Sequence, residues 1–394
     1  MNDFVKIVLL PGKERSLKLF HPWVFSGAIA KVEGSPAEGE IVNVVAHDGS
    51  YLGTGHFHDG SIKVRIFSFS RTDAGEEFWQ EKLRKAYACR KAIGLIDGRE
   101  TTAYRLVHGE GDGLPGVIID IYGKCAVIQI HSSGMYAIRQ HLLSGLQVLY
   151  GSELDSVYDK SSDSMQRQQG VEIQNGFLLG STSETVIREH GNSFLVNWVE
   201  GQKTGFFLDQ RDNRLLLKKY SSGANVLNAF SYSGGFSMYA LQGSARQVIS
   251  VDSSKKAMAM AQENARLNAA EERHQFILSD AFDYLKKVSD PFDVVILDPP
   301  AFAKHLSASA KAMIGYRNLN IDGLRAVKPG GLLFTFSCSQ VIDKTLFRKV
   351  VFQAAAQAKR QVRILYQLSQ GPDHPVNIYH PEGEYLKGLV LYVE

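Results

Sequence analysis

The sequence is poor in several features, and each absence excludes a class of protein. Only three cysteines occur among its 394 residues, an odd and widely spaced set that predicts neither a disulfide framework nor a zinc cluster. No run of eighteen apolar residues occurs, and the first ten residues carry charges in place of the apolar core of a signal peptide. We therefore expect a cytoplasmic protein with no metal and no membrane among its partners.

The chain also lacks a strong charge of either sign. Its formal net charge of +3 permits binding to a nucleic acid but does not argue for it alone, so any RNA-binding surface must be a local patch. Apolar residues make up 44% of the chain, which is enough to bury a large core and to form two or three domains.

Residues 1–72 contain short strand-like runs broken by Gly, Pro and Asp, which predicts a small β domain resembling a barrel. Within it the basic segment 13–18 leads into the aromatic segment 20–25. Interleaved cations and rings are typical of RNA-binding surfaces, but a solvated turn before a core aromatic cluster would explain the same pattern. The candidate RNA-binding residues are Lys13, Arg15, Lys18 and Trp23.

A second domain, residues 73–190, opens with a helical pattern over 76–93 and continues with strand-like runs at 117–122 and 126–131. Between them lies a turn rich in Gly and Asp, for which a tight connection is the simplest explanation. We give less weight to a chemical role for His108, Glu110 or Asp112 in that turn. The polar stretch 161–180 predicts an exposed connection, and a turn at 188–193 leads into a strand predicted at 194–199.

From residue 224 onward, strand and helix patterns alternate, which predicts an α/β domain over residues 191–394. Among the predicted elements are strands at 225–229 and 332–336 and helices at 255–268 and 344–359. Repeated βα units form a parallel sheet with helices on both faces. Ligands bind such sheets at the carboxyl ends of the strands. The motifs considered next each follow a predicted strand, so we expect them along one edge.

Three of these strand ends predict a cofactor site. Adjacent glycines, Gly234 and Gly235, let the backbone approach a ligand, but the three spaced glycines of a dinucleotide site are missing, which disfavours a nicotinamide dehydrogenase. Asp252 ends the second strand, where a carboxylate can accept the ribose hydroxyls; capping the next helix is the alternative. Asp280 ends the third strand, where it can meet an adenine amino group.

Sites for methionine, ribose and adenine together describe S-adenosylmethionine. The preceding segment, 201–214, adds Lys203 or Arg211 for the methionine carboxylate and Phe206 or Phe207 for packing, although a helix start with surface charges is the alternative. The predicted cofactor contacts are Lys203, Phe206, Arg211, Phe230, Ser231, Tyr232, Gly234, Asp252, Ser253, Asp280, Ala281 and Asp298.

Two further strand ends predict the chemistry, Asp298-Pro299-Pro300 and Ser337-Cys338-Ser339. Carbon 5 of cytosine has no lone pair, so a thiolate must first add to C6 before C5 can accept a methyl group. Only about 3% of a free thiol is ionised at pH 7, so the site should also supply a base or a positive field. We expect Cys338 to be the nucleophile and Asp298 to hydrogen-bond cytosine N3 and N4, on a base that is single-stranded or flipped.

Two other functions fit part of the pattern. A methyltransferase acting on a nitrogen, such as guanine N7 or adenine N6, uses the same fold and Asp-Pro-Pro turn but needs no cysteine. A non-catalytic RNA-binding assembly factor is the other, although the glycine loop, Asp252 and Asp280 argue against it.

Eight segments carry a family resemblance along nearly the whole chain: 21–27, 111–116, 189–191, 203–211, 230–236, 298–300, 337–339 and 385–388. In this order they resemble the bacterial 23S rRNA cytosine-5 methyltransferases of the large-subunit I type. The resemblance implies a PUA domain for RNA, a central α/β domain and a Rossmann-like methyltransferase domain acting on 23S rRNA or a large-subunit precursor. We also consider that the protein forms a homodimer. Two departures are Ala301, where many relatives carry Lys, and Arg188, where an acidic residue is frequent.

Overall fold

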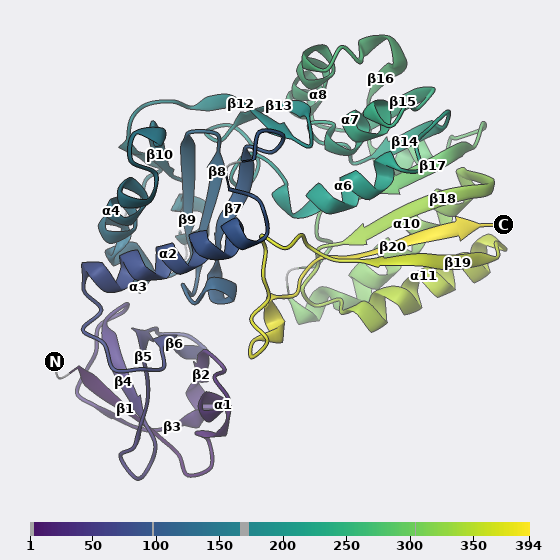
Figure 1. Ribbon diagram of the computed structural model, residues 1–394. Coiled ribbons are helices and arrows are strands. Elements are labelled where there is room, and N and C mark those ends of the chain that lie inside the picture. The colour runs from purple at the N-terminus through teal and green to yellow at the C-terminus, as the bar shows by residue number, and fades with distance from the viewer. Residues whose placement is uncertain (1–3, 97, 166–172, 304) are drawn as a thin grey trace. The chain divides into compact units, whose positions relative to one another are not determined.

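The computed structural model describes residues 4–96, 98–165, 173–303 and 305–394, and the chain divides into two compact units. The N-terminal unit consists of Met1–Thr185, Val196–Phe206 and Pro372–Gly383. The C-terminal unit consists of Val186–Leu195, Phe207–Gly371 and Glu384–Glu394. The chain therefore passes between the units several times, as the colours of Figure 1 show, and each unit combines segments that are distant in sequence.

The N-terminal unit begins with a six-stranded sheet. In β1 the fully buried Ile7 and Leu9 alternate with less buried residues, which is the period of two of a half-buried strand, whereas Val42–Val45 of β4 are all buried. Strand β1 runs parallel to β4, and all other neighbours are antiparallel. In sheet order the strands are β2 (Trp23–Phe25), β6 (Ile62–Ser68), β5 (Tyr51–Phe57), β4 (Ile41–Val45), β1 (Val5–Leu9) and β3 (Ile29–Glu33), with helix α1 (Arg15–Lys18) after β1.

A five-stranded sheet forms the rest of the N-terminal unit's core. Helix α2 (Glu76–Ala92) buries Trp79, Leu83 and Ala86, which share one face because they lie three or four residues apart. Gly145 of helix α4 (Arg139–Tyr150) brings α4 close to α2, since an added Cβ would lie 2.5 Å from a Leu83 methyl. In sheet order the strands are β11 (Gly176–Leu179), β10 (Ser156–Asp159), β9 (Cys125–Ile130), β8 (Val117–Tyr122) and β7 (Ala103–His108).

The C-terminal unit contains a seven-stranded sheet. Its first five strands are parallel, and β20 is antiparallel to both of its neighbours. The chain order reverses between β14 and β17, which is where ligands bind in open α/β sheets. In sheet order the strands are β16 (His274–Leu278), β15 (Gln247–Asp252), β14 (Asn225–Ala229), β17 (Phe292–Leu297), β18 (Val327–Ser337), β20 (Lys387–Val393) and β19 (Val362–Leu368).

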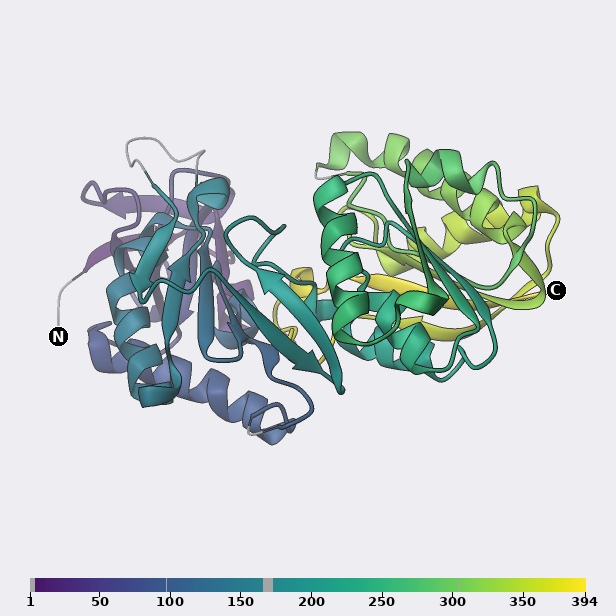
Figure 2. The same ribbon diagram turned by 90° about the horizontal axis from the view of Figure 1, so that it is seen from above.

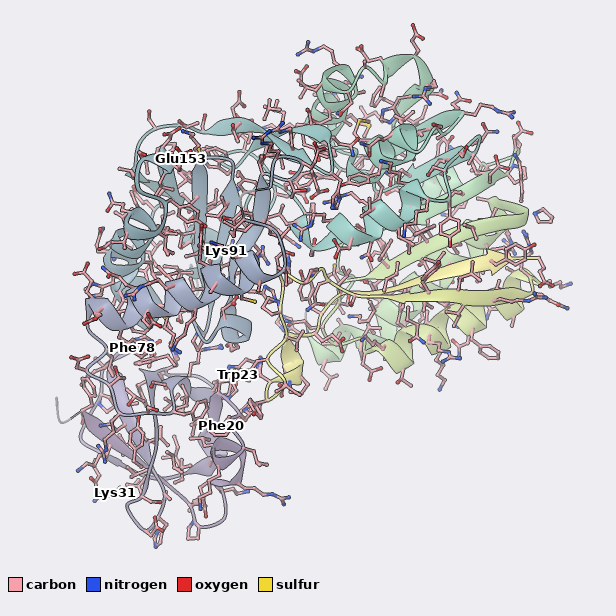
Figure 3. All side chains as sticks on the ribbon, in the orientation of Figure 1. Phe20, Trp23, Lys31, Phe78, Lys91 and Glu153 are labelled. Carbon is pink, nitrogen blue, oxygen red and sulfur yellow. The ribbon has the colours of Figure 1, made fainter. Side chains whose placement is uncertain are left out.

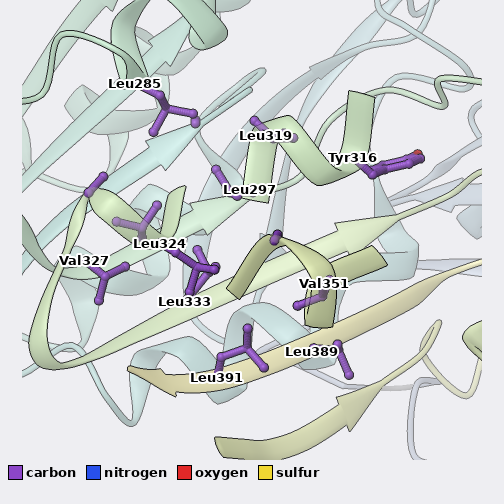
Figure 4. Packing of buried hydrophobic residues seen from close by; sticks show 14 of the residues in the cluster. Leu285, Leu297, Tyr316, Leu319, Leu324, Val327, Leu333, Val351, Leu389 and Leu391 are labelled. Atoms are coloured by element: carbon purple, nitrogen blue, oxygen red, sulfur yellow. The ribbon is translucent and has the colours of Figure 1, made fainter. Parts of the chain in front are cut away.

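Helices cover both faces of this sheet, as the view from above shows (Figure 2). On one face pack α6 (Arg211–Lys218), α7 (Gly235–Gln242) and α8 (Lys255–Leu267), and on the other α9 (Ala281–Leu285), α10 (Ser309–Arg325) and α11 (Lys344–Ala358). Figure 4 shows the core beneath α10 and α11, where Leu297 and Leu333 meet Leu319 and Val351. The predicted fold class is therefore confirmed.

The structure departs from the predicted elements mainly in the middle of the chain. Strands β7 and β10 and helix α4 were not predicted, and the predicted strand at 194–199 is β13 (Asn192–Asn197), which pairs with β12 (Glu184–Glu189). Of the polar stretch 161–180, residues 166–172 lie outside the described residues. Within the described part of the chain, no helix has both the length and the apolar character that a bilayer crossing requires.

Candidate active site in the C-terminal unit

The two motifs that predict the chemistry lie on neighbouring strands. Strands β17 and β18 run parallel, and Leu297 pairs with Thr335, so Asp298 and Cys338 both follow the carboxyl ends of their strands. The Cys338 sulfur lies 3.9 Å from the carbonyl oxygen of Pro299. Asp298 and Cys338 are each partly exposed, so a ligand at this edge can reach both side chains.

The serines on either side of Cys338 are buried and hold its backbone. The Ser339 hydroxyl lies 2.9 Å from the hydroxyl of Tyr316 on α10, and Ser337 is fully buried. Burial raises the pKa of the Tyr316 hydroxyl, so Tyr316 stays neutral and able to donate. The position of the sulfur is therefore set by its neighbours on the strand.

A buried lysine lies beside this segment. In the antiparallel pairing of β18 with β20, Lys387 is opposite Ser337, and its ammonium donates to the carbonyls of Ser339 (2.7 Å) and Tyr385 (2.6 Å). Lys387 is only 4% exposed, and this burial lowers the pKa of its ammonium to about 8. An electrostatic interaction with Cys338 acts in the opposite direction and favours the charged form of Lys387.

Sequence reasoning did not assign Lys387 a role. The sequence contains one chemical indication of this role. A thiol nucleophile needs a base or a positive field, and a lysine follows Tyr385-Leu386 in one of the family segments. Its position is set by a contact distant in sequence: the Tyr385 hydroxyl donates to Asp209 at 2.7 Å. Among the described residues, no group of three His, Cys, Asp or Glu side chains is placed to hold a metal ion.

The loop after β14 has an unusual backbone. Phe230, Tyr232 and Gly234 have φ angles of 61°, 46° and 80°, in the left-handed region that is costly for residues other than glycine. At Gly234 an added Cβ would also lie 3.3 Å from the Cβ of Ala261. The amide of Asn264 on α8 donates to the Ser233 carbonyl at 2.8 Å and fixes the turn. Strain held in this way is typical of a loop that carries a ligand.

Asp252 is oriented by two backbone groups. One carboxylate oxygen accepts from the amide of Tyr232 and the other from the amide of Ser254, both at 2.9 Å. Each oxygen keeps further acceptor capacity, which suits the two hydroxyls of a ribose. Capping the next helix, the alternative role considered for Asp252, is carried out by Ser254. Its hydroxyl caps α8 by accepting from the amide of Ala257. Ser253 is exposed beside them.

Asp280 combines its predicted position with a structural role. Its Oδ1 accepts from the amides of Phe282 (2.8 Å) and Asp283 (3.1 Å) and so caps α9, while the residue remains exposed at the end of β16. Ala281 is buried as the first residue of α9. A cap leaves the carboxylate with acceptor capacity, as in Asp252.

Aromatic rings run along the same edge of the sheet. The ring centroids of Phe230 and Phe282 lie 5.6 Å apart, those of Phe282 and Phe302 5.9 Å, and those of Phe302 and Tyr316 4.3 Å. The row extends from the glycine loop to the Tyr316 hydroxyl that holds Ser339. Flat apolar surfaces of this kind accept planar rings such as adenine or a pyrimidine base.

Arg211 and Arg214 on helix α6 are both buried. Arg211 is 1% exposed, with its Nε 3.6 Å from an Asp212 oxygen. Arg214 forms a two-pronged ion pair with Glu189, at 2.8 Å for each hydrogen bond, so the motif at residues 189–191 supports α6. Lys203, which is exposed, and Phe206, which is buried, belong to the N-terminal unit. They stay predictions as cofactor contacts.

Comparison with known proteins agrees with this geometry. A family model described as an S-adenosylmethionine-dependent methyltransferase matches residues 164–380. The ribosomal RNA large subunit methyltransferases I of Klebsiella pneumoniae (strain 342) and Aeromonas salmonicida (strain A449) are 39% and 41% identical to this chain. They cover 99% and 98% of it, and it covers 98% and 99% of them. The chain belongs to this methyltransferase family.

The fold is shared with a candidate SAM-dependent methyltransferase from Streptococcus mutans, which is 24% identical with a TM-score of 0.84. That alignment covers 98% of this chain and all of the other. A model of a PUA-like domain also matches residues 7–69 of the methyltransferase. S-adenosylmethionine is the cofactor, and the glycine loop and the oriented Asp252 suit it.

The methyltransferase exposes three of the four predicted RNA-binding residues. Lys13, Arg15 and Lys18 lie on the surface, with Lys18 3.6 Å from Glu14. Trp23 instead packs against the ring of His380, 4.4 Å away, and donates to Glu110 at 2.8 Å. Its position is also visible in Figure 3. All four remain predictions as RNA contacts.

The glycine-rich turn of the N-terminal unit contains structural contacts. Asp112 accepts from both terminal nitrogens of Arg90 and from the amide of His108, at 2.6 Å for the latter. Glu110 accepts from Arg65 as well as from Trp23. The three residues weighed for a chemical role therefore all take part in holding the turn.

Proposed function

We propose that this methyltransferase forms 5-methylcytosine in 23S rRNA through a covalent adduct between Cys338 and C6 of the target cytosine. The observation that carries the proposal is the placement of Cys338 beside Pro299, at the strand end next to Asp298, with the ammonium of Lys387 adjacent. The relatives' names support ribosomal RNA of the large subunit as the substrate.

Cys338 acts as the nucleophile. Its thiolate adds to C6, and the electron pair of the C5–C6 bond moves to C5, which then accepts the methyl group. Loss of the C5 proton afterwards restores the double bond and expels the thiolate. S-adenosylmethionine, when bound, supplies the electrophilic methyl group. A target cytosine must leave any duplex first, because C6 is covered by stacking.

Asp298 and Lys387 assist at different stages. Asp298 hydrogen-bonds N3 and N4 of the base, which stabilises the ring while the thiolate adds. Lys387 acts as a positioning residue: its ammonium, fixed by two carbonyls, provides the positive field that favours the thiolate. The two prolines after Asp298 remove backbone donors and stiffen the turn that presents it.

The cofactor would be held along the carboxyl edge of β14, β15 and β16. The loop of Phe230, Ser231, Tyr232 and Gly234 would lie beside it. Asp252, with Ser253 next to it, would accept the ribose hydroxyls, and Asp280 and Ala281 would border the adenine. Arg211 and Lys203 are the candidates for the methionine carboxylate.

The test is covalent trapping with RNA that carries 5-fluorocytidine. Fluorine at C5 cannot leave as a cation, so the adduct should persist and migrate as a protein–RNA band on a denaturing gel. Cys338→Ala should give no band and no 5-methylcytosine while still binding S-adenosylmethionine by calorimetry. Turnover by Cys338→Ala would instead indicate methylation of a nitrogen, such as guanine N7 or adenine N6. Absence of cofactor binding in the wild type would favour an assembly factor.

We also propose a division into domains 1–72, 73–190 and 191–394. Three hydrophobic clusters of the described residues support it, one containing Val44, one Leu106 and one Val295, although Phe67 of the first range packs in the second cluster. A homodimer and a cytoplasmic location stay predictions, which the mass in solution and cell fractionation would check.

A further inference from the structure

A hollow of about 540 Å³ lies in the N-terminal unit, among residues to which the proposed reaction assigns no role. It is lined by the end of β6, by helix α2 and by the segment 372–383. Its volume is within the range of about 300–1,000 Å³ found for small-ligand sites. We call it the aromatic hollow and define it by Phe20, Phe69, Arg71, Phe78, Lys82 and Tyr379.

Two of its rings are exposed in a way that core packing does not explain. Phe20 is 46% exposed and Tyr379 is 49% exposed. Phe20 also has a φ angle of 60°, which is strained for a residue with a bulky side chain. Its ring meets Phe69 at 89° and Tyr379 at 54°, so it stacks face to face on neither. Phe20 and Phe78 are labelled in Figure 3.

Lys82 adds a positive charge that lacks a carboxylate partner. It is partly buried, its ammonium lies 5.5 Å from the centroid of Phe78, and a Cβ added at Gly113 would be 3.0 Å from its nitrogen. Among the described residues no carboxylate forms an ion pair with Lys82. Burial, together with repulsion by the charge of Lys85, lowers the pKa of Lys82 to about 8.

The remaining charges around the aromatic hollow are mostly positive. Lys85 and Arg71 line it and are exposed; Lys85 has Glu81 at 3.8 Å, and Arg71 lies over the ring of Tyr51. The one carboxylate of the lining, Glu110, is 2.9 Å from Arg65 and is therefore neutralised. Rings and cations in one hollow match a ligand with a flat base and a phosphate.

We propose that the aromatic hollow binds one unstacked nucleotide of a single-stranded RNA segment, with the base against Phe20 and Tyr379 and a phosphate on Lys82. This site rests on the proposed function, because it requires RNA as the substrate. Aromatic rings stack on any base, and a paired base offers no free face, so the site selects single strands over duplexes. An acidic peptide would satisfy Lys82 but would leave the two exposed rings unused.

The test uses the full chain and two fluorescent probes without cytosine, an oligoadenylate and an RNA duplex of the same length. Phe20→Leu and Tyr379→Leu keep an apolar side chain but remove the ring, and each should weaken oligoadenylate binding about tenfold without changing duplex binding. Lys82→Met should weaken it about fivefold and lower the salt slope by about one. Lys91→Met, on the same helix but outside the hollow (Figure 3), is the matched control and should change neither.

Unchanged oligoadenylate affinity in the double variant Phe20→Leu, Tyr379→Leu would overturn the site, as would equal competition by an oligoglutamate. Circular dichroism of each variant separates a lost contact from a lost fold. The probes cannot be methylated at cytosine, so the measurement is independent of the chemistry. If trapping by 5-fluorocytidine fails while the ring variants still lose affinity, the proposed reaction is wrong and the nucleotide site stands.

Discussion

Two lysines, one in each unit, have a similar pKa but different surroundings. Burial lowers the pKa of Lys387 and of Lys82 to about 8 in each case. The ammonium of Lys387 is fixed by two backbone carbonyls, whereas that of Lys82 faces a ring and a second lysine. Lys387, whose ammonium is hydrogen-bonded to the protein backbone, can act on the site only through its electric field. Lys82, which has no such hydrogen bonds among the described residues, can bind an incoming anion.

The largest expected difference between Lys387 and Lys82 is in the rate of methyl transfer. Lys387→Met should lower methyl transfer by about tenfold to a hundredfold, because the thiolate loses its positive field, and the rate should rise only at higher pH than in the wild type. Lys387→Arg should recover part of the activity near pH 7. These are read from the pH profile of single-turnover 5-methylcytosine formation.

Lys82→Met serves as the comparison in that assay. Its rate at saturating RNA should match that of the wild type at every pH. An unshifted pH profile for Lys387→Met would mean that this lysine only supports the strand.

A smaller effect, of opposite sign in the two variants, is expected on stability. Lys387→Met removes the ammonium that donates to the carbonyls of Ser339 and Tyr385, and it should lower the free energy of unfolding by roughly 1–3 kcal/mol. The Ser339 carbonyl still accepts from the amide of Ile342 at 3.1 Å. Lys82→Met removes a charge that burial disfavours and should raise the free energy of unfolding by about 1 kcal/mol at pH 7. Urea denaturation at pH 7 measures both free energies of unfolding. A lower value for Lys82→Met than for the wild type would show instead that Lys82 makes a contact that stabilises the folded protein.

The smallest expected effect is the pH dependence of the difference in unfolding free energy between Lys82→Met and the wild type. Below about pH 8 Lys82 is charged in the folded and the unfolded chain, so the penalty of burying the charge is fully present. Between about pH 8 and 10.5, the ordinary pKa of a lysine, only the unfolded chain holds the proton, so wild-type stability rises with pH. The advantage of Lys82→Met over the wild type should therefore shrink across this window, as parallel denaturation series would show.

The sequence was a better guide to the large sheet than to either lysine. Strand β14 and helices α8 and α11 were predicted to within one residue at each end, because a buried parallel strand and an amphipathic helix are local patterns. Strand β18 begins at Val327, five residues before the prediction, because the segment Lys328–Gly331 has the composition of a turn. The burial of Lys387 depends on Asp209 and Tyr385, which no local pattern connects.

The position of the last strand determines when the sheet can be completed during synthesis. Strand β20 lies between β18 and β19 in the sheet and carries Lys387, yet it is encoded after both and after the segment 372–383 of the other unit. A chain made only as far as residue 371 therefore contains β18 and β19 without the strand that joins them. The seven-stranded sheet therefore becomes continuous only once β20 has been made, and Lys387 reaches Ser339 at that same step.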